Sequence, residues 1–433
     1  MNPQAEELNR IISEKSPVTM NLLSKRGKNI FFPKKGILGQ TADAKGKRIN
    51  ATIGAAIEDD GTPMRLTSIE DQIRIEPEMS FPYAPSFGRP DLRKQWQAMI
   101  KAKNPGLGET EISLPVVTNA LTHGLSIVGY LFTDQDQEII SPDLYWGNYN
   151  LIFSHAYHTK FKLFNLFKGD DFDLKSFESA VLDSEIGKKV ILLNFPNNPT
   201  GYTPTGSEVD TITEIIHKAA LKGNNLVIVI DDAYFGFIYE DGIEEESIFA
   251  KIANLHENVL AIKIDGATKE DYVWGFRVGF ITYGIKNGSP ELYDALASKT
   301  AGAVRGNISN ASNLSQSLLV KAFKSPSYDD EKSVKYKILE ARYKKVKSVL
   351  SDPKFNEYFK ALPFNSGYFM CLKLREGLDG ESIRQLLLEK YQTGLINLAN
   401  TFRIAFSSVA EDNIEELFEN IFAACRESED TSK

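Results

Sequence analysis

Between Ser113 and Gly284, short apolar runs alternate with longer segments of helical periodicity. Continuous apolar strands separated by helices are typical of a mostly parallel sheet that is covered by helices on both faces. Two of the intervening segments, Ser207–Leu221 and Ser247–Leu255, are amphipathic and are predicted to be helical. The apolar runs predict seven strands, at Leu114–Thr118, Glu138–Ser141, Phe161–Phe167, Val190–Phe195, Leu226–Ile230, Leu260–Ile264 and Val278–Tyr283. This alternation constrains the fold more than any other feature, and it predicts an α/β protein.

The C-terminal part of the chain has a different pattern. Its first element is a Lys-rich helix at Tyr336–Leu350, and we interpret the positive run of that helix, which includes Arg342 and Lys345, as a solvated face. Four further elements are predicted after it: a strand at Gly367–Leu374, a helix at Gly380–Lys390, a strand at Phe402–Phe406 and a helix at Asp412–Ala423. Together they predict a smaller α+β unit.

The N-terminal part carries few signals. A short amphipathic helix is predicted at Glu6–Ile12, and the Lys/Gly-rich stretch Lys25–Lys47 is predicted to be an extended arm. A length of 433 residues allows two or three domains. We predict an N-terminal arm with part of a small domain at residues 1–64, a large domain at 65–325 and a small C-terminal domain at 326–433.

Composition excludes several classes of protein. The net charge of −8 does not favour nucleic acid as a partner, and no apolar run approaches the roughly 20 residues that span a bilayer. Met1–Arg10 lack both a basic start and an apolar stretch, so we expect no secretory signal, and the two cysteines, Cys371 and Cys425, are predicted to be buried thiols. The histidines lack the spacing of metal ligands, so we expect no metal. These features predict a cytoplasmic protein.

Four unusual clusters each follow a predicted strand. They are Thr118–Gly124, Asn194–Gly201, Asp231–Tyr234 and Asp265–Lys269. Open α/β sheets bind ligands at the carboxyl ends of their strands. The four clusters are therefore predicted to form one site.

The residue types in these clusters suit one chemistry. A lysine amine such as that of Lys269 forms Schiff bases, and an aspartate such as Asp231 holds a proton on a ring nitrogen. Asn198 and Tyr234 are donors for a phenolate oxygen. A phosphate is matched by the free N–H groups at the start of the helix near Ala120–Thr122 and by the guanidinium of Arg277. Each residue alone has an ordinary explanation as a turn, cap or surface residue; the prediction rests on their joint arrangement.

These motifs resemble those of the class I aminotransferases, in the aspartate and aromatic branch of the pyridoxal-5'-phosphate (PLP) enzymes of fold type I. Asn198-Pro-Thr-Gly201 resembles the family's NPTG motif, and Asp231-x-Ala-Tyr234 resembles its DxAY motif. Lys269, followed by Gly275-x-Arg277-x-Gly279, resembles its Schiff-base lysine and phosphate-binding arginine. The resemblance implies a large PLP-binding domain with a mostly parallel seven-stranded sheet between helices, and a smaller α+β domain.

The resemblance assigns further residues. It implies that Trp146 stacks on the cofactor ring and that the turn at Ala120 and Leu121 binds the cofactor's phosphate. Further implied roles are substrate binding by Gly54, a grip on the substrate carboxylate by Arg403, and contacts from Tyr83 and Arg305 to the active site of the partner subunit in a homodimer.

Several positions depart from the family's pattern. Gly266 stands where a phosphate-binding Ser is usual, and Tyr149 stands where a His is common, so the support of Asp231 is expected to differ. Ala120 and Leu121 replace the more usual glycine and small residue of the phosphate-binding turn. The two prolines that the family has after Asn310 are absent.

The implied function is amino-group transfer from an L-amino acid to a 2-oxo acid, of the aspartate or aromatic type, with glutamate and 2-oxoglutarate as one pair. One alternative is a PLP-dependent lyase or synthase on the same fold. A second is a PLP-binding regulator without catalytic activity; the short N-terminal segment and the acidic net charge argue against the DNA-binding domain that it requires.

Overall fold

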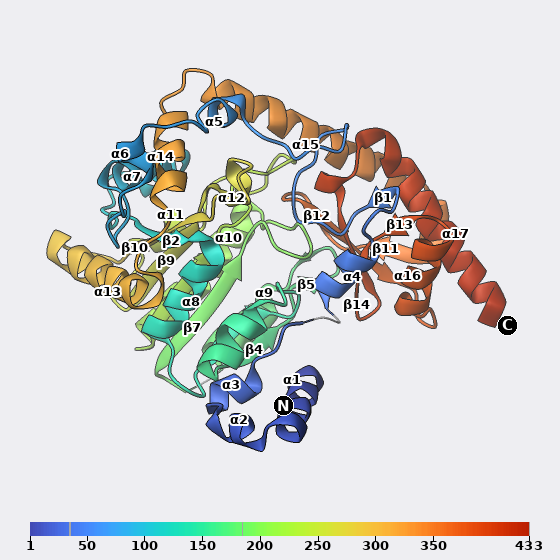
Figure 1. Ribbon diagram of the computed structural model, residues 1–433, viewed down its shortest axis with the longest axis horizontal. Helices are drawn as coiled ribbons and strands as arrows, with labels where there is room; N and C mark the ends of the chain where they lie inside the picture. The colour runs from blue at the N-terminus through green and yellow to red at the C-terminus, as the bar shows by residue number, and fades with distance from the viewer. Residues whose placement is uncertain (34–35, 184, 433) are drawn as a thin grey trace.

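The computed structural model describes residues 1–33, 36–183 and 185–432 (Figure 1). Its central sheet has seven strands in the order β2-β10-β9-β8-β7-β3-β4. β10 runs antiparallel to β2 and β9, whereas the other neighbouring pairs are parallel. The strands are β2 (Val116–Asn119), β3 (Glu138–Pro142), β4 (Lys160–Phe164), β7 (Lys188–Asn194), β8 (Asn225–Asp231), β9 (Val259–Asp265) and β10 (Val278–Gly284). All seven predicted strands and the mostly parallel sheet are confirmed.

Burial explains why these runs become strands. In β8 every residue after Asn225 is buried, and β10 is buried along its whole length. The helices between strands turn their apolar stripes to this sheet, as α10 (Gly206–Leu221) does after a capping box formed by Thr205 and Glu208. The predicted helix at Ser207–Leu221 is thus confirmed. That at Ser247–Leu255 contains a single helical turn, α11 (Phe249–Ile252).

Other elements surround the central sheet and its loops. The helices are α5 (Thr67–Glu70), α6 (Pro77–Ser80), α7 (Pro90–Lys103), α8 (Ala120–Phe132), α9 (Leu174–Leu182), α12 (Ala267–Glu270), α13 (Pro290–Ile308) and α14 (Asn313–Ala322). A small hairpin pairs β5 (Phe167–Lys168) with β6 (Asp171–Phe172). A π-helical segment, η2 (Asn150–His155), lies between β3 and β4.

The second sheet is antiparallel and contains the C-terminal strands. Its order is β11-β12-β15-β14, with β11 (Phe359–Ala361), β12 (Phe369–Leu374), β15 (Thr401–Ala405) and β14 (Ile396–Leu398). The helices α16 (Gly380–Glu389) and α17 (Ile414–Ser432) pack beside it, and α15 (Tyr328–Leu350) runs toward it from the large sheet (Figure 1). β1 (Ile49–Asn50) pairs in parallel with β13 (Thr393–Gly394), so an N-terminal segment does join the C-terminal unit. The exact domain boundaries stay a prediction.

The prediction of an extended arm at Lys25–Lys47 is wrong for the described part of that stretch; residues 34–35 lie outside the described residues. The chain forms α1 (Pro3–Lys15), α2 (Pro17–Leu22), α3 (Lys25–Asn29) and α4 (Ile37–Asp43). Local capping accounts for α3, because the Ser24 hydroxyl accepts from the backbone N–H of Gly27 at 3.0 Å. A tertiary contact holds α4, because the Gln40 side chain exchanges two hydrogen bonds with the backbone of Asn397.

The interpretation of the positive run on α15 as a solvated face is wrong for Arg342. Its side chain is 0% exposed, donates to the carbonyl of Ser407 at 2.6 Å and pairs with Asp59 at 2.8 Å. Arg342 thus ties α15 to two other segments. Both cysteines are free and buried, as predicted.

Candidate active site

The four clusters converge at the carboxyl ends of neighbouring strands. Asn194 at the end of β7 is in register with Asp231 at the end of β8, and Asp231 is in register with Ile264 of β9. Asn119, at the end of β2, pairs with Val278 at the start of β10. The shared edge that the sequence predicted is therefore present.

Asp231 is buried, with an exposed fraction of 3%. The phenol of Tyr149 donates to its Oδ2 at 2.5 Å, and the backbone N–H of Ala233 donates to its Oδ1 at 3.1 Å. Burial raises the pKa of Asp231 to about 6, although the Tyr149 hydrogen bond and the charge of Lys269 oppose that rise. The unusual Tyr149 is therefore the side-chain partner of this carboxylate.

Lys269 lies in the single turn of α12, directly after β9. Its ammonium nitrogen is 5.1 Å from the centre of the Tyr234 ring. Burial lowers the pKa of Lys269 to about 8; the charge of Asp231 opposes this shift and that of Arg277 adds to it. Tyr368 donates to the backbone carbonyl of Lys269 at 3.2 Å and so holds the turn. With this pKa roughly a tenth of the amine is uncharged at pH 7, far more than in an ordinary lysine, and the uncharged amine is the form that acts as a nucleophile.

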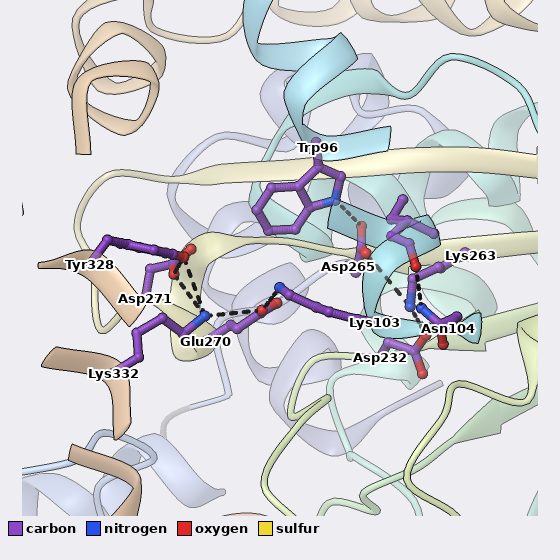
Figure 2. Close-up of polar contacts among 11 residues, drawn as sticks. Trp96, Lys103, Asn104, Asp232, Lys263, Asp265, Glu270, Asp271, Tyr328 and Lys332 are labelled. Atoms are coloured by element: carbon purple, nitrogen blue, oxygen red, sulfur yellow. Dashed lines mark hydrogen bonds and ion pairs between the residues drawn. The ribbon is translucent and has the colours of Figure 1, made fainter. Parts of the chain in front are cut away.

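The two residues after Lys269, Glu270 and Asp271, are held by side chains of other elements (Figure 2). Glu270 pairs with Lys103 of α7 and with Lys332 of α15, the latter at 3.1 Å. Asp271 pairs with Lys332 at 3.2 Å and accepts a short hydrogen bond from Tyr328. The turn that carries Lys269 is thus clamped from two sides.

The NPTG turn is held closely against the second sheet. Asn198 is buried and its backbone N–H donates to the Asn194 side chain at 2.9 Å. Gly201 has a φ of +72°, and a Cβ there would lie 1.9 Å from the carbonyl oxygen of Phe369. Only glycine fits this approach. Tyr234 lies in the loop directly after β8, and burial raises the pKa of its phenol.

At the predicted phosphate-binding site, the backbone at Gly279 of β10 lies close against the start of α8. A Cβ on Gly279 would lie 2.6 Å from the carbonyl carbon of Ala120, at the first residue of α8. Ala120 itself has a φ of +61°, which costs energy for a residue with a side chain. Arg277 is partly buried and donates to the carbonyl of Trp274 at 3.2 Å. The N–H groups of Ala120 and Leu121 at this helix start suit an anion.

The geometry explains the glycine at position 266. A Cβ there would lie 2.6 Å from the carbonyl oxygen of Val278 and 2.7 Å from the Cα of Gly279. A serine would therefore require the backbone of β10 to move. This departure from the family's pattern follows from packing, and a side-chain phosphate contact from residue 266 is absent.

Arg403 closes the site from the second sheet. It is 3% exposed, and it donates to the carbonyl of Thr52 at 2.8 Å. Its guanidinium carbon lies 4.5 Å from the centre of the Phe369 ring, and its Nε has no hydrogen-bond partner within the described part of the chain. A Cβ on Gly54 would lie 3.2 Å from Phe369 and 3.8 Å from the Tyr234 hydroxyl. Gly54, Tyr234 and Arg403 thus lie around Phe369.

Three predicted residues lie apart from this centre or at its rim. Trp146 is partly buried, and its ring lies 5.5 Å from that of Tyr149, edge to face. Tyr83 is 88% exposed. Arg305, on α13, is exposed and donates to Ser309 on the next turn at 2.9 Å. Tyr83 and Arg305 face solvent in the single chain.

The sequence analysis did not select Phe369 or Tyr368. Both lie in an apolar stretch in which aromatic residues are ordinary core residues, so the sequence offered no signal for them. The bond between Tyr149 and Asp231 had a weak signal, namely the tyrosine in place of a common histidine. Only the structure shows that the Tyr149 hydroxyl donates to Asp231.

The fold and the site together define a fold-type I PLP enzyme. The chain belongs to the aminotransferase class I and II family, which it matches over residues 58–421. It is therefore a PLP-dependent aminotransferase, as the sequence predicted, and these comparisons give no support to the lyase or synthase alternative.

Sequence relatives include aspartate aminotransferases. The chain is 24% identical over 332 residues to the cytoplasmic aspartate aminotransferase of Caenorhabditis elegans. The alignment covers 74% of this chain and 78% of that protein. It is 25% identical over 294 residues to aspartate aminotransferase of Bacillus subtilis, covering 66% and 68% of the two chains.

Solved structures share the fold. An aminotransferase from Anaerococcus prevotii superposes with a TM-score of 0.80 at 24% identity, covering 93% of this chain and 99% of that one. The aspartate aminotransferase from the cytoplasm of Saccharomyces cerevisiae gives a TM-score of 0.74 at 19% identity, covering 95% and 99%. Among the described residues, no helix is long and apolar enough to cross a bilayer.

Proposed function

We propose that this aminotransferase exchanges amino groups between an L-amino acid of the aspartate or aromatic type and a 2-oxo acid, with glutamate and 2-oxoglutarate as one pair. The observation that carries the proposal is Arg403, a buried guanidinium at the site whose Nε is unpartnered among the described residues. A planar, permanently charged guanidinium binds a carboxylate in bidentate fashion, and both classes of substrate have an α-carboxylate.

The residues present fit PLP. α8 begins without a hydrogen bond from a capping side chain, so the backbone N–H groups at its start suit a phosphate, and Arg277 supplies a cation beside them. Asp231 would hold the ring nitrogen, Asn198 and Tyr234 the ring's 3'-oxygen, and Trp146 one face of the ring. The bound cofactor supplies an electron sink for the carbon that carries the amino group.

The chain's own groups divide the remaining work. Lys269 would hold the cofactor through its Nζ, and its free amine would then move the proton at the substrate's Cα. A pKa of about 8 suits both tasks, because the amine then exists in both protonation states near neutral pH. Arg403 would fix the α-carboxylate, beside Gly54 at the entrance.

We also propose a cytoplasmic homodimer in which Tyr83 and Arg305 reach the partner's site. Their exposure in the single chain leaves both side chains accessible to a partner subunit, with Tyr83 88% exposed. Arg305 would bind the distal carboxylate of a dicarboxylic substrate. Replacing Arg305 by alanine should then raise the KM for glutamate about 10-fold or more, with little effect on an aromatic substrate.

The experiment is a single half-reaction. The purified protein with bound PLP is mixed with excess L-glutamate and no 2-oxo acid, and absorbance and products are followed. We expect the visible cofactor band to bleach while one equivalent of 2-oxoglutarate per subunit appears and no ammonia is released. Ammonia release would instead indicate elimination, and an unchanged band would exclude glutamate as the donor.

A further inference from the structure

Lys332 of α15 bridges the two acidic residues that follow Lys269 (Figure 2). Its ammonium lies 3.1 Å from Glu270 and 3.2 Å from Asp271, and it donates to the hydroxyl of Tyr328 at 3.3 Å. Tyr328 in turn donates to Asp271, whose side chain is fully buried. One side chain of α15 therefore holds both residues on the carboxyl side of Lys269.

The charge of Asp271 depends on Lys332. Burial raises the pKa of Asp271, and the charge of Lys332 is the largest effect that opposes this rise. Among the residues that the structure describes, Lys332 is the one cation that pairs with Asp271, whereas Glu270 also pairs with Lys103. Without Lys332, Asp271 would be left as an unpaired buried carboxylate, which takes up a proton. The ionic link between Asp271 and α15 would then be lost.

The helix that carries Lys269 has few contacts of its own to hold it. α12 is a single turn of four residues, and a helix of this length is not stable by itself. Its other side-chain contacts are the pair of Glu270 with Lys103 and the hydrogen bond from Tyr368 to the carbonyl of Lys269. The place of the Lys269 amine thus depends on tertiary contacts. A shift of about 1 Å in a reacting group can lower a rate about 100-fold.

The same helix, α15, also contacts the segment that follows Gly54. Lys335, on the next turn after Lys332, pairs with Glu58 at 2.6 Å. The side chains of Lys332 and Lys335 are each 20% exposed. The two lysines therefore share a helix, an exposure and a type of partner, and only Lys332 contacts the residues beside Lys269.

We propose that Lys332 is a positioning residue for Lys269: by bridging Glu270 and Asp271 it fixes α12 to α15, and so holds the Lys269 amine where it reaches both PLP and the Cα proton of the substrate. The inference rests on the proposed role of Lys269. It identifies a residue outside every motif of the sequence analysis. It also separates two effects, because the substrate carboxylate is assigned to Arg403, so that kcat rather than KM depends on Lys332.

The test compares Lys332→Met with Lys335→Met. Each protein is freed of PLP, and the rate at which the visible band forms on adding PLP measures how readily Lys269 bonds to it. Equilibrium dialysis gives the affinity for pyridoxamine 5'-phosphate, which binds without a bond to the lysine. The loaded proteins are then assayed for kcat and KM with glutamate, with and without deuterium at its Cα.

In Lys332→Met we expect the band to form about 10-fold more slowly or less, with the affinity for pyridoxamine 5'-phosphate within about threefold of the wild type. kcat should fall about 10–100-fold with KM within about threefold, and the deuterium effect on kcat should increase, because a displaced amine slows the proton transfer. Lys335→Met should match the wild type in band formation and in the deuterium effect. Lys332→Arg, which keeps the charge, should recover most of both rates.

Three results would overturn the proposal. They are wild-type behaviour of Lys332→Met, equal changes in both methionine variants, and a parallel loss of affinity for pyridoxamine 5'-phosphate, which would mean that the whole cofactor site has loosened. Lys332→Gln keeps a hydrogen-bond donor without the charge and covers the case in which Lys332→Met does not fold. It should change the same quantities in the same direction, and a folded Lys332→Gln protein that matches the wild type would contradict the proposal.

Failure of the proposed function gives a different result. Band formation needs no amino acid, so a wild type that forms the band but does not react with glutamate would count against the proposed substrates alone. A band that persists in Lys269→Ala would instead remove the role of Lys269, and with it the inference about Lys332.

Discussion

Asp231 and Asp232 are adjacent in sequence and lie in opposite kinds of environment. They point to opposite sides of the sheet: Asp231, the last residue of β8, is in register with Ile264 of β9, whereas Asp232, directly after β8, contacts Lys263, which points to the other face of β9. Asp231 receives a neutral phenol, whereas Asp232 pairs with the fully buried Lys263 and accepts from Ser247 at 2.6 Å. Lys263 also lies 3.6 Å from Asp265 (Figure 2).

The lysines of the two faces differ in the same way. Burial alone would lower the pKa of Lys263, but Asp232 and Asp265 raise it. Burial lowers the pKa of Lys269 to about 8, and the charge of Asp231 opposes this only in part. A lysine with two carboxylates is a structural cation. A buried lysine kept apart from direct carboxylate partners is available for chemistry.

The comparison teaches that burial alone does not mark an active site. Both aspartates and Lys263 are buried and Lys269 is partly buried, and their partners decide what they do. Around Asp232 each buried charge has an oppositely charged partner, because Lys263 lies between Asp232 and Asp265. Such a cluster is stable only while all of its members are present. The face of Asp231 leaves charge and hydrogen-bonding capacity for a ligand.

The largest expected effect comes from Lys269→Ala. Turnover should fall by at least about 10⁴-fold, because both the group that holds PLP and the group that moves the Cα proton are lost. Steady-state rates with glutamate measure this effect. Lys218→Ala, at an exposed ion pair with Glu214, is the control and should leave the rate unchanged. More than about 1% residual activity in Lys269→Ala would assign the chemistry to another residue.

The matching change on the other face is Lys263→Met. It leaves Asp232 and Asp265 buried without their cation, so the free energy of unfolding should fall by about 3–5 kcal/mol. Urea denaturation of the cofactor-free protein measures it, with Lys218→Met as an exposed control whose unfolding curve should match that of the wild type. A loss below about 1 kcal/mol in Lys263→Met would mean that the pair is not needed for stability.

The sequence predicted the large sheet well because parallel strands that are buried on both faces consist of continuous apolar runs, as in β7 and β8. It also located Asn198, Asp231 and Lys269, since polar residues directly after such runs stand out. Their roles came from the resemblance to a family, and single residues gave no roles by themselves.

What the sequence missed depends on tertiary contacts. The burial of Arg342 requires Asp59 and the Ser407 carbonyl, which are far from it in sequence. α4 is held by Asn397, more than 350 residues away. Local pattern does not encode such partners, and an aromatic residue such as Phe369 has the same appearance in a core and in a substrate site.

Lys269→Met should raise the free energy of unfolding, whereas Lys263→Met should lower it. The folded-state pKa of about 8 lies below the ordinary value of 10.5, so at pH 7 the cofactor-free fold buries an ammonium at a cost. Removing the charge should stabilise the fold by about 1–3 kcal/mol at pH 7.

That gain depends on pH. Between pH 8 and 10.5 the unfolded wild type binds more protons at this lysine than the folded form does. The stability of the wild type therefore rises with pH in this range, and the advantage of Lys269→Met should disappear by about pH 10. Urea midpoints at pH 7 and pH 10 measure it. A Lys269→Met protein that is less stable than the wild type at pH 7 would show that this lysine has a stabilising partner.

The smallest expected effect comes from Ser247→Ala. The Ser247 hydroxyl donates to Asp232 at 2.6 Å and accepts the Phe249 N–H at 3.2 Å, so it links the buried carboxylate to the start of α11. Its loss should lower the free energy of unfolding by about 1–2 kcal/mol, since Lys263 still pairs with Asp232. Because Asp232 faces away from the site, kcat with glutamate should stay within about twofold of the wild type. A fall in kcat well beyond twofold would mean that Asp232 influences the active site. The distinction between a structural and a chemical aspartate would then fail.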